Sequence, residues 1–380
     1  MNILIATTSY PDENEGAAAA GVFVRDFALA LHGEGVEVSV VAPGLASRQT
    51  LEHGLHVHRF AVPRLPLSLL KPYQPQDWLA IRQTMRAGYA ALDQVCTERR
   101  IDRILALWAL PTGAWAQRVA RKHNIPYATW ALGSDIWTLG QLPLLRQWLR
   151  HVLRGAERRF ADGLQLGDDV EHICGLSCAF LPSARRLSDE RVMPPQGQPP
   201  YRLAFLGRWH ANKGIDLLLE VLTLLNDADW QLIEAVRIFG GGPLGTEVHA
   251  AVTGLQQAGR AIEVGGYLNQ AEATQLLAWA DYVLIPSRIE SIPVIFSDAM
   301  QLGRPVIAMP VGDLPALIER HGCGLRAQAT NATAFAKSLR QALHTSPREF
   351  AAGIQSARMQ FDIQASAQQF LQPLTPRELA

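Results

Sequence analysis

Cysteine and long hydrophobic runs are both scarce in this sequence, and each shortage excludes a class of protein. Four cysteines among 380 residues are too few for a disulfide framework. Cys174 and Cys178 lie four residues apart near His172, a spacing that a metal site could use, but no second ligand pair follows, so buried thiols are expected instead. No stretch approaches the ~18 apolar residues of a membrane-spanning helix, and the amino terminus lacks the basic start of a signal peptide. We therefore expect a cytoplasmic protein.

The sequence also lacks a net charge. Its 35 basic and 35 acidic residues argue against a nucleic-acid-binding protein that relies on bulk electrostatics. All but four of the basic residues are arginines, and the lysines are Lys71, Lys122, Lys213 and Lys337. A hydrophobic content of 48% with 18% charged residues is typical of a globular protein and excludes a disordered one. The length suffices for two domains of ordinary size.

Short apolar runs alternate with longer amphipathic segments along the whole chain. The runs predicted to form strands are residues 3–7, 36–42, 55–61, 104–107, 127–131, 203–206, 232–239, 262–264, 282–285 and 306–309. The segments predicted to form helices are residues 23–32, 78–99, 115–122, 144–160, 215–225, 244–257, 271–279 and 295–302. Regular alternation of this kind indicates an α/β protein with parallel sheets, and the continuous apolar strands are typical of a sheet covered on both faces.

One segment interrupts this pattern. Residues 183–201 contain four prolines and five charged residues but no periodic apolar face, which is typical of an interdomain linker. We therefore expect two doubly wound parallel-sheet domains that face each other across a cleft. In such sheets ligands bind at the carboxyl ends of the strands, near the amino termini of helices.

Three loops after strands of the second half carry residues that suggest chemistry. The first contains Gly207, Arg208, Lys213 and Gly214, and it places two cations beside a helix amino terminus. This combination suits a diphosphate, and the alternative is a basic pair on a solvated loop.

The second loop contains residues 240–243, a run of three glycines that ends at Gly242 and is followed by Pro243. Glycines allow close approach of the backbone to a ligand, but a plain tight turn explains them equally well. The pattern is not G-x-G-x-x-G, and this disfavours a nicotinamide dinucleotide site.

The third loop contains Ser287 and Glu290 and leads into a helix that carries Asp298. The backbone amides of Ile295 and Phe296 would point along the helix axis toward an anion. Two carboxylates on either side of a bound phosphate could grip two sets of hydroxyls. The helix dipole alone would also explain Asp298.

Together these three segments, from about residue 201 to 326, resemble the nucleotide-binding domain of the retaining family 4 glycosyltransferases, which have the GT-B fold. The resemblance implies an acceptor-binding domain at residues 1–190, completed by a final crossover helix at 361–380, and a nucleotide-sugar-binding domain at 191–360. In the first domain we match the family's glycine-containing loop to Gly21, with Gly16 as the second choice. Selection of the nucleotide base is expected near Gly266 and Tyr267.

The resemblance implies transfer of a hexosyl unit, with retention, from a UDP- or GDP-sugar to a saccharide or lipid-linked saccharide in cell-surface polysaccharide or glycoconjugate synthesis. Arg208 and Lys213 would stabilise the leaving diphosphate, while Glu290 would orient the donor sugar and Asp298 would hold the ribose. The nucleotide sugar is a co-substrate, and no metal or other cofactor is expected. The alternatives are a non-catalytic GT-B subunit and a nucleotide-sugar epimerase or hydrolase.

Two departures from the family pattern concern the site. Asp298 replaces the family's second Glu and loses one methylene of reach. The family's His-Gly-x-Asp segment here begins with Leu132, so the histidine is absent, while Asp135 is retained and is expected to contact the acceptor or the transferred sugar.

A basic amphipathic helix is predicted over residues 144–160. Its arginines, spaced four residues apart, are Arg146, Arg150, Arg154 and Arg158. Such a helix could touch an anionic membrane, where lipid-linked acceptors are found. The alternative is a helix packed on the sheet with a solvated arginine stripe. The sequence assigns no oligomeric state.

Overall fold

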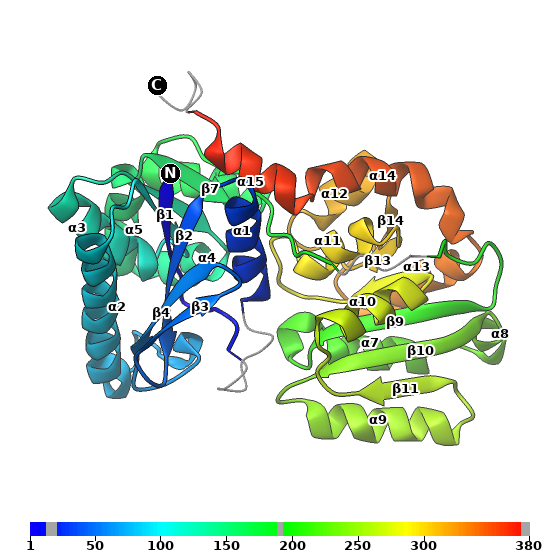
Figure 1. Cartoon of the computed structure of the whole chain (residues 1–380). Coiled ribbons are helices and arrows are strands. Elements are labelled where there is room, and N and C mark those ends of the chain that lie inside the picture. Colours follow the sequence, from blue (N-terminus) through cyan, green and yellow to red (C-terminus); the bar gives the residue numbers. More distant parts are fainter. Residues whose placement is uncertain (13–20, 188–192, 374–380) are drawn as a thin grey trace. The chain divides into compact units, whose positions relative to one another are not determined.

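The computed structural model of the chain describes residues 1–12, 21–187 and 193–373. The chain divides into two compact units (Figure 1), the first formed by Met1–Pro182 with Ile363–Ala380 and the second by Ser183–Asp362. Each unit contains one sheet covered by helices, so the predicted α/β architecture with two doubly wound parallel sheets is confirmed.

The first unit is built on an eight-stranded sheet in the order β3-β4-β2-β1-β5-β6-β7-β8. All neighbouring strands are parallel except β3 and β4, which form an antiparallel pair. The strands are β1 (Asn2–Ala6), β2 (Glu37–Gly44), β3 (Arg48–Glu52), β4 (Leu55–Ala61), β5 (Arg103–Leu107), β6 (Tyr127–Ala131), β7 (Arg158–Ala161) and β8 (Ala179–Phe180).

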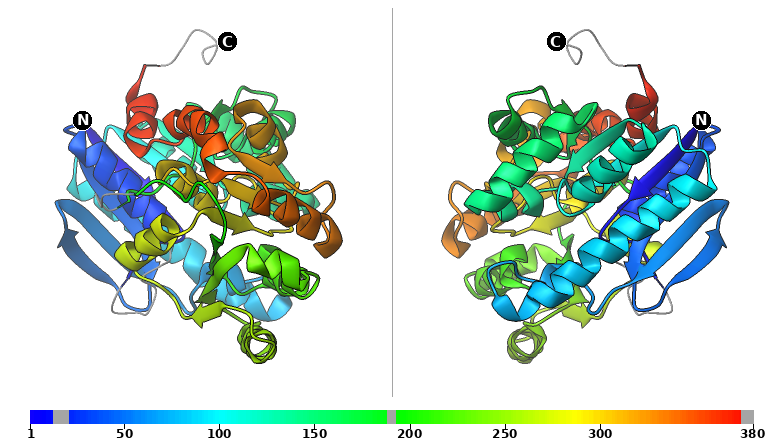
Figure 2. Two further views of the ribbon diagram at one scale, coloured as in Figure 1. Left: turned by 90° about the vertical axis from the view of Figure 1, so that its right-hand side faces the viewer. Right: turned by 90° about the vertical axis from the view of Figure 1, so that its left-hand side faces the viewer.

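Helices pack on both faces of this sheet. They are α1 (Val22–Gly33), α2 (Trp78–Glu98), α3 (Thr112–His123), α4 (Ser134–Trp137), α5 (Pro143–Gly155), α6 (Leu164–Cys174) and α15 (Ile363–Leu371), with short 3₁₀ turns η1 (Leu67–Leu69), η2 (Pro75–Asp77) and η3 (Leu139–Gln141). Alternate residues of a strand point to opposite faces. Leu4 therefore belongs to a buried cluster with residues of α2, α3, α5 and α6, whereas Ile5 belongs to a second cluster with residues of α1 and α15. Figure 2 shows the ribbon from two further sides. The returning α15 is anchored by Phe370, whose ring lies 6.0 Å from that of Phe27.

The second unit is built on a six-stranded, entirely parallel sheet in the order β11-β10-β9-β12-β13-β14. Its strands are β9 (Tyr201–Arg208), β10 (Ile233–Gly241), β11 (Ile262–Gly265), β12 (Tyr282–Ile285), β13 (Val306–Ala308) and β14 (Gly324–Arg326). Its helices are α7 (Ile215–Thr223), α8 (Asp227–Gln231), α9 (Gly245–Gln257), α10 (Gln270–Trp279), α11 (Val294–Gln301), α12 (Leu314–His321), α13 (Ala332–Leu343) and α14 (Ala351–Gln360), with 3₁₀ turns η4 (Ala211–Lys213) and η5 (Pro347–Phe350).

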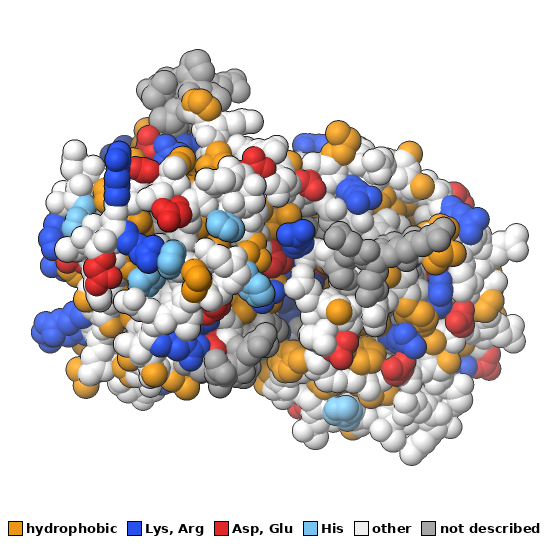
Figure 3. Space-filling view, viewed as in Figure 1, with side chains coloured by type: hydrophobic (Ala, Val, Ile, Leu, Met, Phe, Trp, Pro, Cys, Tyr) orange, Lys and Arg blue, Asp and Glu red, His pale blue; other side chains and the backbone are white. Residues whose placement is uncertain are grey.

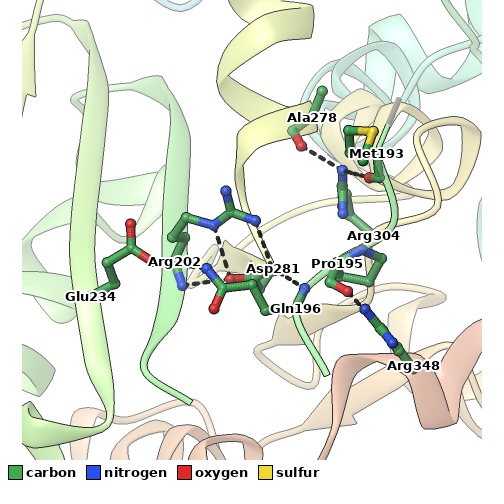
Figure 4. A network of polar contacts seen from close by, with 9 residues as sticks. All are labelled: Met193, Pro195, Gln196, Arg202, Glu234, Ala278, Asp281, Arg304 and Arg348. Carbon is green, nitrogen blue, oxygen red and sulfur yellow. Dashed lines mark hydrogen bonds and ion pairs between the residues drawn. The ribbon is translucent and has the colours of Figure 1, made fainter. Parts of the chain in front are cut away.

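The end of the proline-rich segment before β9 is held on the second unit by a buried polar network (Figure 4). The Asp281 carboxylate is fully buried and accepts hydrogen bonds from the backbone amide of Gln196 at 2.7 Å and from Arg202. Arg304, also fully buried, donates to the Met193 carbonyl at 2.5 Å, and burial lowers its pKa to about 10. Residues 193–196 therefore pack as part of the second unit, although their composition is typical of a linker.

The helix predicted over residues 144–160 is wrong at its carboxyl end. Helix α5 ends at Gly155, Ala156 is extended, and residues 158–161 form the buried strand β7. Arg158 therefore does not continue the arginine stripe, and its guanidinium donates to the Phe370 carbonyl at 3.0 Å. Two consecutive arginines concealed this strand, because buried strands are ordinarily apolar.

Candidate functional site

The carboxyl edge of the second unit's sheet brings together the loops that carry the predicted donor site. Strands β9, β10, β11 and β12 are parallel, so the segments that follow them leave the same edge of the sheet. Arg208 ends β9, Gly241 ends β10, Tyr267 follows β11, and Ser287 and Glu290 follow β12.

Lys213 and Glu290 meet at this edge as an ion pair. The same Glu290 oxygen accepts a hydrogen bond from the Ser287 hydroxyl at 3.1 Å. The lysine side chain is 36% exposed and the carboxylate 12% exposed, so a small molecule can reach both groups. The structure thus joins Lys213 to Glu290, which lies 77 positions further along the sequence.

Arg288, which sequence reasoning missed, fastens these two loops to each other. Its guanidinium forms a two-pronged ion pair with Asp216, at 2.7 and 2.6 Å, and donates to the Ala211 carbonyl at 2.6 Å. Its backbone amide donates to the Asn212 carbonyl at 2.8 Å. The hydrogen bonds from Arg288 lower the pKa of the Asp216 carboxyl group. This clamp fixes Lys213 relative to the loop after β12.

Gly214 allows the same two loops to touch. Its backbone φ is +68°, and a Cβ atom at this position would lie 1.8 Å from the Pro286 carbonyl oxygen. No other residue fits this contact without displacement of the backbone. The predicted Lys213-Gly214 pair therefore has a packing role in addition to any contact with a ligand.

Arg208 differs from its basic neighbours because its side chain is exposed at the end of β9. Within the described ranges, 1–12, 21–187 and 193–373, its guanidinium has no hydrogen-bond or ion-pair partner. An exposed, unpaired guanidinium at the same sheet edge as the Lys213–Glu290 pair is available to bind an anion.

The glycine loop after β10 is shaped by Trp209. The Trp209 amide donates to the Gly241 carbonyl at 2.8 Å, and a Cβ atom on Gly242 would lie 2.6 Å from the Trp209 carbonyl oxygen. Gly242 and the following Pro243 thus form a tight turn that these backbone contacts require. The Tyr267 hydroxyl donates to the same Gly241 carbonyl at 2.9 Å, while its ring remains 63% exposed.

Helix α11 begins directly after the loop that follows β12, which carries Ser287 and Glu290. The Phe296 amide already donates to the Pro293 carbonyl at 2.8 Å, and the Phe296 ring is fully buried. For Val294 and Ile295 the described part of the chain provides no acceptor for the amide. The amides without an acceptor at this helix terminus are therefore those of Val294 and Ile295. The Ile295 amide can still donate to an anion, as predicted, whereas the Phe296 amide is already used.

Asp298 lies one turn further along α11 and is completely buried. Both of its carboxylate oxygens face Arg185, which forms an ion pair with it and donates from Nε at 3.2 Å. Sequence reasoning missed Arg185 because it lies 113 residues away. A ribose hydroxyl at this carboxylate would have to share it with the guanidinium.

In the first unit, Asp135 joins two loops at the carboxyl edge of the sheet. Its carboxylate accepts hydrogen bonds from the amides of Ala109, at 2.6 Å, and Leu132, at 3.3 Å. The residue is 1% exposed, and burial raises its pKa to about 6. Asp135 therefore fixes the loops after β5 and β6, and any contact with an acceptor remains a prediction.

Gly21, the other residue predicted for the first unit, directly precedes α1 with a φ of +69°. Gly16 lies outside the described residues.

Trp108 is a further candidate that the sequence did not suggest. It directly follows β5 and adopts a φ of +66°, which is rare for a bulky residue and marks candidate functional positions. Its half-buried ring meets that of Phe23 edge-on, with ring centres 6.2 Å apart. Trp108 thus lies beside the start of α1 at the carboxyl edge of the sheet, the edge at which such folds bind ligands.

The arginines of α5 have structural partners. Arg150 and Arg154 donate to the carbonyls of Ile173 and Cys174, at 2.7 and 2.8 Å, and thereby cap the end of α6. Arg146 donates to the Gly140 carbonyl at 3.3 Å.

Among the residues that the structure describes, no three His, Cys, Asp or Glu side chains gather as metal ligands would, and no helix is both long and apolar enough to cross a bilayer. All four cysteines are free thiols, and all but the partly buried Cys178 are buried.

Comparison with known proteins connects both units to sugar transfer. The family described as "Glycosyl transferase 4-like domain" matches residues 18–172, and that described as "Glycosyl transferases group 1" matches residues 200–345. The chain is 26% identical to the putative teichuronic acid biosynthesis glycosyltransferase TuaC of Bacillus subtilis, over 84% of each chain. It is 22% identical to N-acetyl-alpha-D-glucosaminyl L-malate synthase of Bacillus anthracis, over 90% of this chain and 88% of the relative.

Solved structures extend this likeness to the fold. The sucrose-phosphate synthase of Thermosynechococcus elongatus superposes with a TM-score of 0.72 at 17% identity, over 97% of both chains. Anabaena HepE in complex with UDP and glucose gives a TM-score of 0.70 at 16% identity, over 97% of this chain and 98% of HepE. At 17% and 16% identity these superpositions show a shared fold and nothing further.

Proposed function

Because this chain is a family 4 glycosyltransferase with the GT-B fold, we propose that it moves a hexosyl unit from a nucleoside-diphosphate sugar to a saccharide or lipid-linked saccharide. The transfer proceeds with retention at the anomeric carbon. The relationship to a putative teichuronic acid biosynthesis enzyme supports a role in cell-surface polysaccharide or glycoconjugate synthesis.

The observation that carries this proposal is the Lys213–Glu290 ion pair at the sheet edge where the unpaired Arg208 also lies. When a donor binds, Lys213 and Glu290 can separate from each other and contact different parts of the same donor molecule. The ammonium then binds the diphosphate, and the carboxylate accepts hydroxyl groups of the sugar. In the absence of donor the two groups neutralise each other, so neither is left half-buried without a partner.

In the proposed reaction the bond between the anomeric carbon and the diphosphate oxygen breaks, and its electron pair stays on the diphosphate. The acceptor oxygen forms the new bond on the same face of the sugar ring, and its proton passes to the leaving diphosphate. Negative charge grows on the leaving oxygen, and in this proposal Arg208, Lys213 and the Ile295 amide stabilise it. Glu290 holds the sugar so that its anomeric carbon faces the acceptor.

We infer that Asp298 and Arg185 together form the ribose end of this site. A buried carboxylate whose oxygens both face a guanidinium is stabilised as an anion. Arg185 therefore occupies carboxylate lone pairs that the ribose hydroxyls would otherwise use. Asp298, which is one methylene shorter than the family's Glu, meets the ribose together with Arg185 rather than alone.

We also propose that transfer needs no metal ion, because two cations and a helix amino terminus already provide positive potential at the diphosphate. Addition of EDTA tests this directly: unchanged transfer supports it, and loss of transfer that Mg²⁺ restores refutes it.

The experiment for the main proposal presents UDP-, GDP- and ADP-hexoses to the purified chain with a mixture of saccharide acceptors. Proton NMR then follows the anomeric signals of donor and product. A product with the anomeric configuration of its donor supports retaining transfer, and an inverted product contradicts retention. Conversion of the donor sugar without any transfer would support an epimerase or hydrolase instead.

A further inference from the structure

Exposed hydrophobic side chains gather on one segment of the first unit. Leu69, Tyr73, Trp78 and Leu79 are 48%, 62%, 59% and 67% exposed, and they lie within eleven consecutive residues. The segment joins β4 to α2 and includes the first turn of that helix. The described residues contain ten other exposed large hydrophobic side chains spread over the rest of the chain, so this concentration is a distinct surface feature.

The segment has a fixed conformation that presents these side chains outward. Asp77 is buried beneath it, forms an ion pair with Arg64 at 2.9 Å and accepts the Lys71 amide at 2.9 Å. The Trp78 indole nitrogen donates to the Pro72 carbonyl at 2.8 Å. Because the polar atom of the indole is satisfied within the segment, its exposed surface is mainly apolar ring.

The same region is basic, although the chain as a whole is neutral. Residues 62–92 contain four cations, Arg64, Lys71, Arg82 and Arg86, and one acidic residue, Asp77, which is buried. Trp78, Arg82 and Arg86 follow each other at four-residue spacing and therefore share one face of α2. Exposed apolar and basic side chains thus share this segment and the first turns of α2.

A shallow groove of about 550 Å³ extends this surface between the end of β4 and α2. Its lining includes Val62, Pro63, Ala87 and Ala90, with Arg86 at the same site. Figure 3 shows hydrophobic and basic side chains side by side at the end of the first unit where α2 begins.

We propose that residues 62–90, the β4–α2 surface, bind the interface of an anionic lipid membrane. Tyr and Trp rings favour the headgroup region, exposed leucines enter the acyl boundary, and Arg and Lys pair with lipid phosphates. The surface begins at the carboxyl edge of the first unit's sheet, where β4 ends. Membrane binding at this edge brings the enzyme to a lipid-linked acceptor. That the acceptor is lipid-linked rests on the proposed function.

This surface fits a membrane better than α5 does. The α5 arginines Arg150 and Arg154 are engaged by the carbonyls that end α6. What α5 offers is two apolar side chains, Leu144 and Trp148, which are 82% and 40% exposed. These two residues provide a matched control, because they have the same chemistry as Leu79 and Trp78.

Vesicle co-sedimentation of the full chain tests the proposal. We expect binding to phosphatidylcholine vesicles that contain phosphatidylglycerol, weaker binding in high salt, and no binding to phosphatidylcholine alone. Substitution of both Trp78→Ser and Leu79→Ser abolishes binding. Substitution of both Arg82→Gln and Arg86→Gln weakens it about 30-fold, since each basic residue near an anionic surface contributes about one factor of five. The Leu144→Ser, Trp148→Ser control binds like the wild type.

Three results would overturn the proposal. The first is failure of the wild type to sediment with anionic vesicles, and the second is an equal loss of binding in the α5 control. The third is a wild type that is a dimer without vesicles and becomes a monomer when the β4–α2 surface is substituted. That result would assign the surface to a second copy of the chain. Thermal shift by nucleoside diphosphates is expected to be unchanged in every variant. It also reports whether each variant folds, so failure at the membrane is distinguishable from failure of the donor site.

Discussion

At the carboxyl edge of the second unit's sheet, charged side chains hold the loops to one another, whereas at the same edge of the first unit backbone amides converge on one buried carboxyl group. In the second unit the Lys213–Glu290 and Arg288–Asp216 pairs link the loops after β9 and β12. In the first unit Asp135 accepts amides from the loops after β5 and β6, and Trp108 adopts a left-handed backbone conformation. The second edge is thus suited to an anion.

This difference explains why the sequence indicated the second unit's site in detail but suggested only Gly21 and Asp135 in the first unit. Recognition of a diphosphate requires cations at fixed spacing beside a helix amino terminus, and such residues can be read directly from the sequence. Recognition of a saccharide can depend on ring faces and backbone groups, which leave little trace. The predictions below test the two edges against each other, beginning with the largest effect.

Removal of Lys213 or Glu290 should have the greatest effect. We expect Lys213→Ala or Glu290→Ala to lower transfer at least about 10²-fold, the scale of one lost transition-state contact. The double variant should lose less than the product of the two single losses, because each single change leaves a half-buried partner unpaired. Steady-state kinetics measure this. Lys337→Ala, an exposed lysine of α13, is the control and should turn over normally, whereas wild-type rates in the Lys213 variant would remove the second unit's edge from the mechanism.

The buried carboxyl group of the first unit should be visible in the pH dependence of stability. Burial raises the folded-state pKa of Asp135 to about 6, above the ~3.9 of an exposed Asp. Between these values the folded chain binds more protons than the unfolded chain, so the contribution of this group to stability falls as the pH rises from about 4 to about 6 and is constant above that.

Denaturant unfolding of the wild type and of Asp135→Asn over this pH range isolates that contribution. The difference in free energy of unfolding between the wild type and Asp135→Asn should change by about 2–3 kcal/mol between about pH 4 and about pH 6. A difference that does not vary with pH would show that Asp135 titrates as an exposed residue and would contradict its structural role.

The Arg288 clamp should affect turnover more than donor binding, because it positions Lys213 and Glu290 without contacting the donor itself. We expect Arg288→Ala to lower kcat about 10-fold with a smaller change in KM. Arg288→Lys should recover only part of this loss, since an ammonium cannot form the two-pronged contact with Asp216. Arg260→Ala breaks an ion pair with the exposed Asp227 in the same unit and should be neutral. An equal loss in that control would mean that any surface pair matters as much.

Trp108 should show the smallest effect and an unusual order of stability. Trp108→Gly should be more stable than Trp108→Ala by about 1 kcal/mol, because glycine tolerates a φ of +66° and alanine does not. In the second unit Gly214→Ala should be destabilising for the same backbone reason. Thermal unfolding compares the three variants. If Trp108→Ala proves the more stable of its pair, the left-handed conformation of Trp108 does not hold in solution.

Much of the fold could be predicted because buried parallel strands are continuous apolar runs. The strands at 55–61, 127–131 and 282–285 were predicted with the bounds that the structure shows. Strand β7 was missed because Arg158 and Arg159 are buried in it, with their guanidinium groups on backbone carbonyls. Strand β3 was missed because its side chains are mostly exposed and polar.

The candidate site divides in the same way. Lys213 and Glu290 could be predicted from local sequence, and the structure adds that they pair with each other. Arg288 and Arg185 could not, since their partners lie 72 and 113 residues away. Only the folded sheet brings those side chains together, and the backbone conformation of Trp108 likewise depends on neighbours from other strands.

Nucleoside diphosphate binding measured by thermal shift tests the central claim most directly, because it reports on the second unit's edge without knowledge of the acceptor. The account predicts that UDP, GDP or ADP raises the melting temperature of the wild type and of Lys337→Ala. The shift should be lost in Lys213→Ala and Arg208→Ala and retained in Glu290→Ala, whose carboxylate serves the sugar. No shift with any of the three nucleotides, or an undiminished shift in Lys213→Ala, would contradict the account.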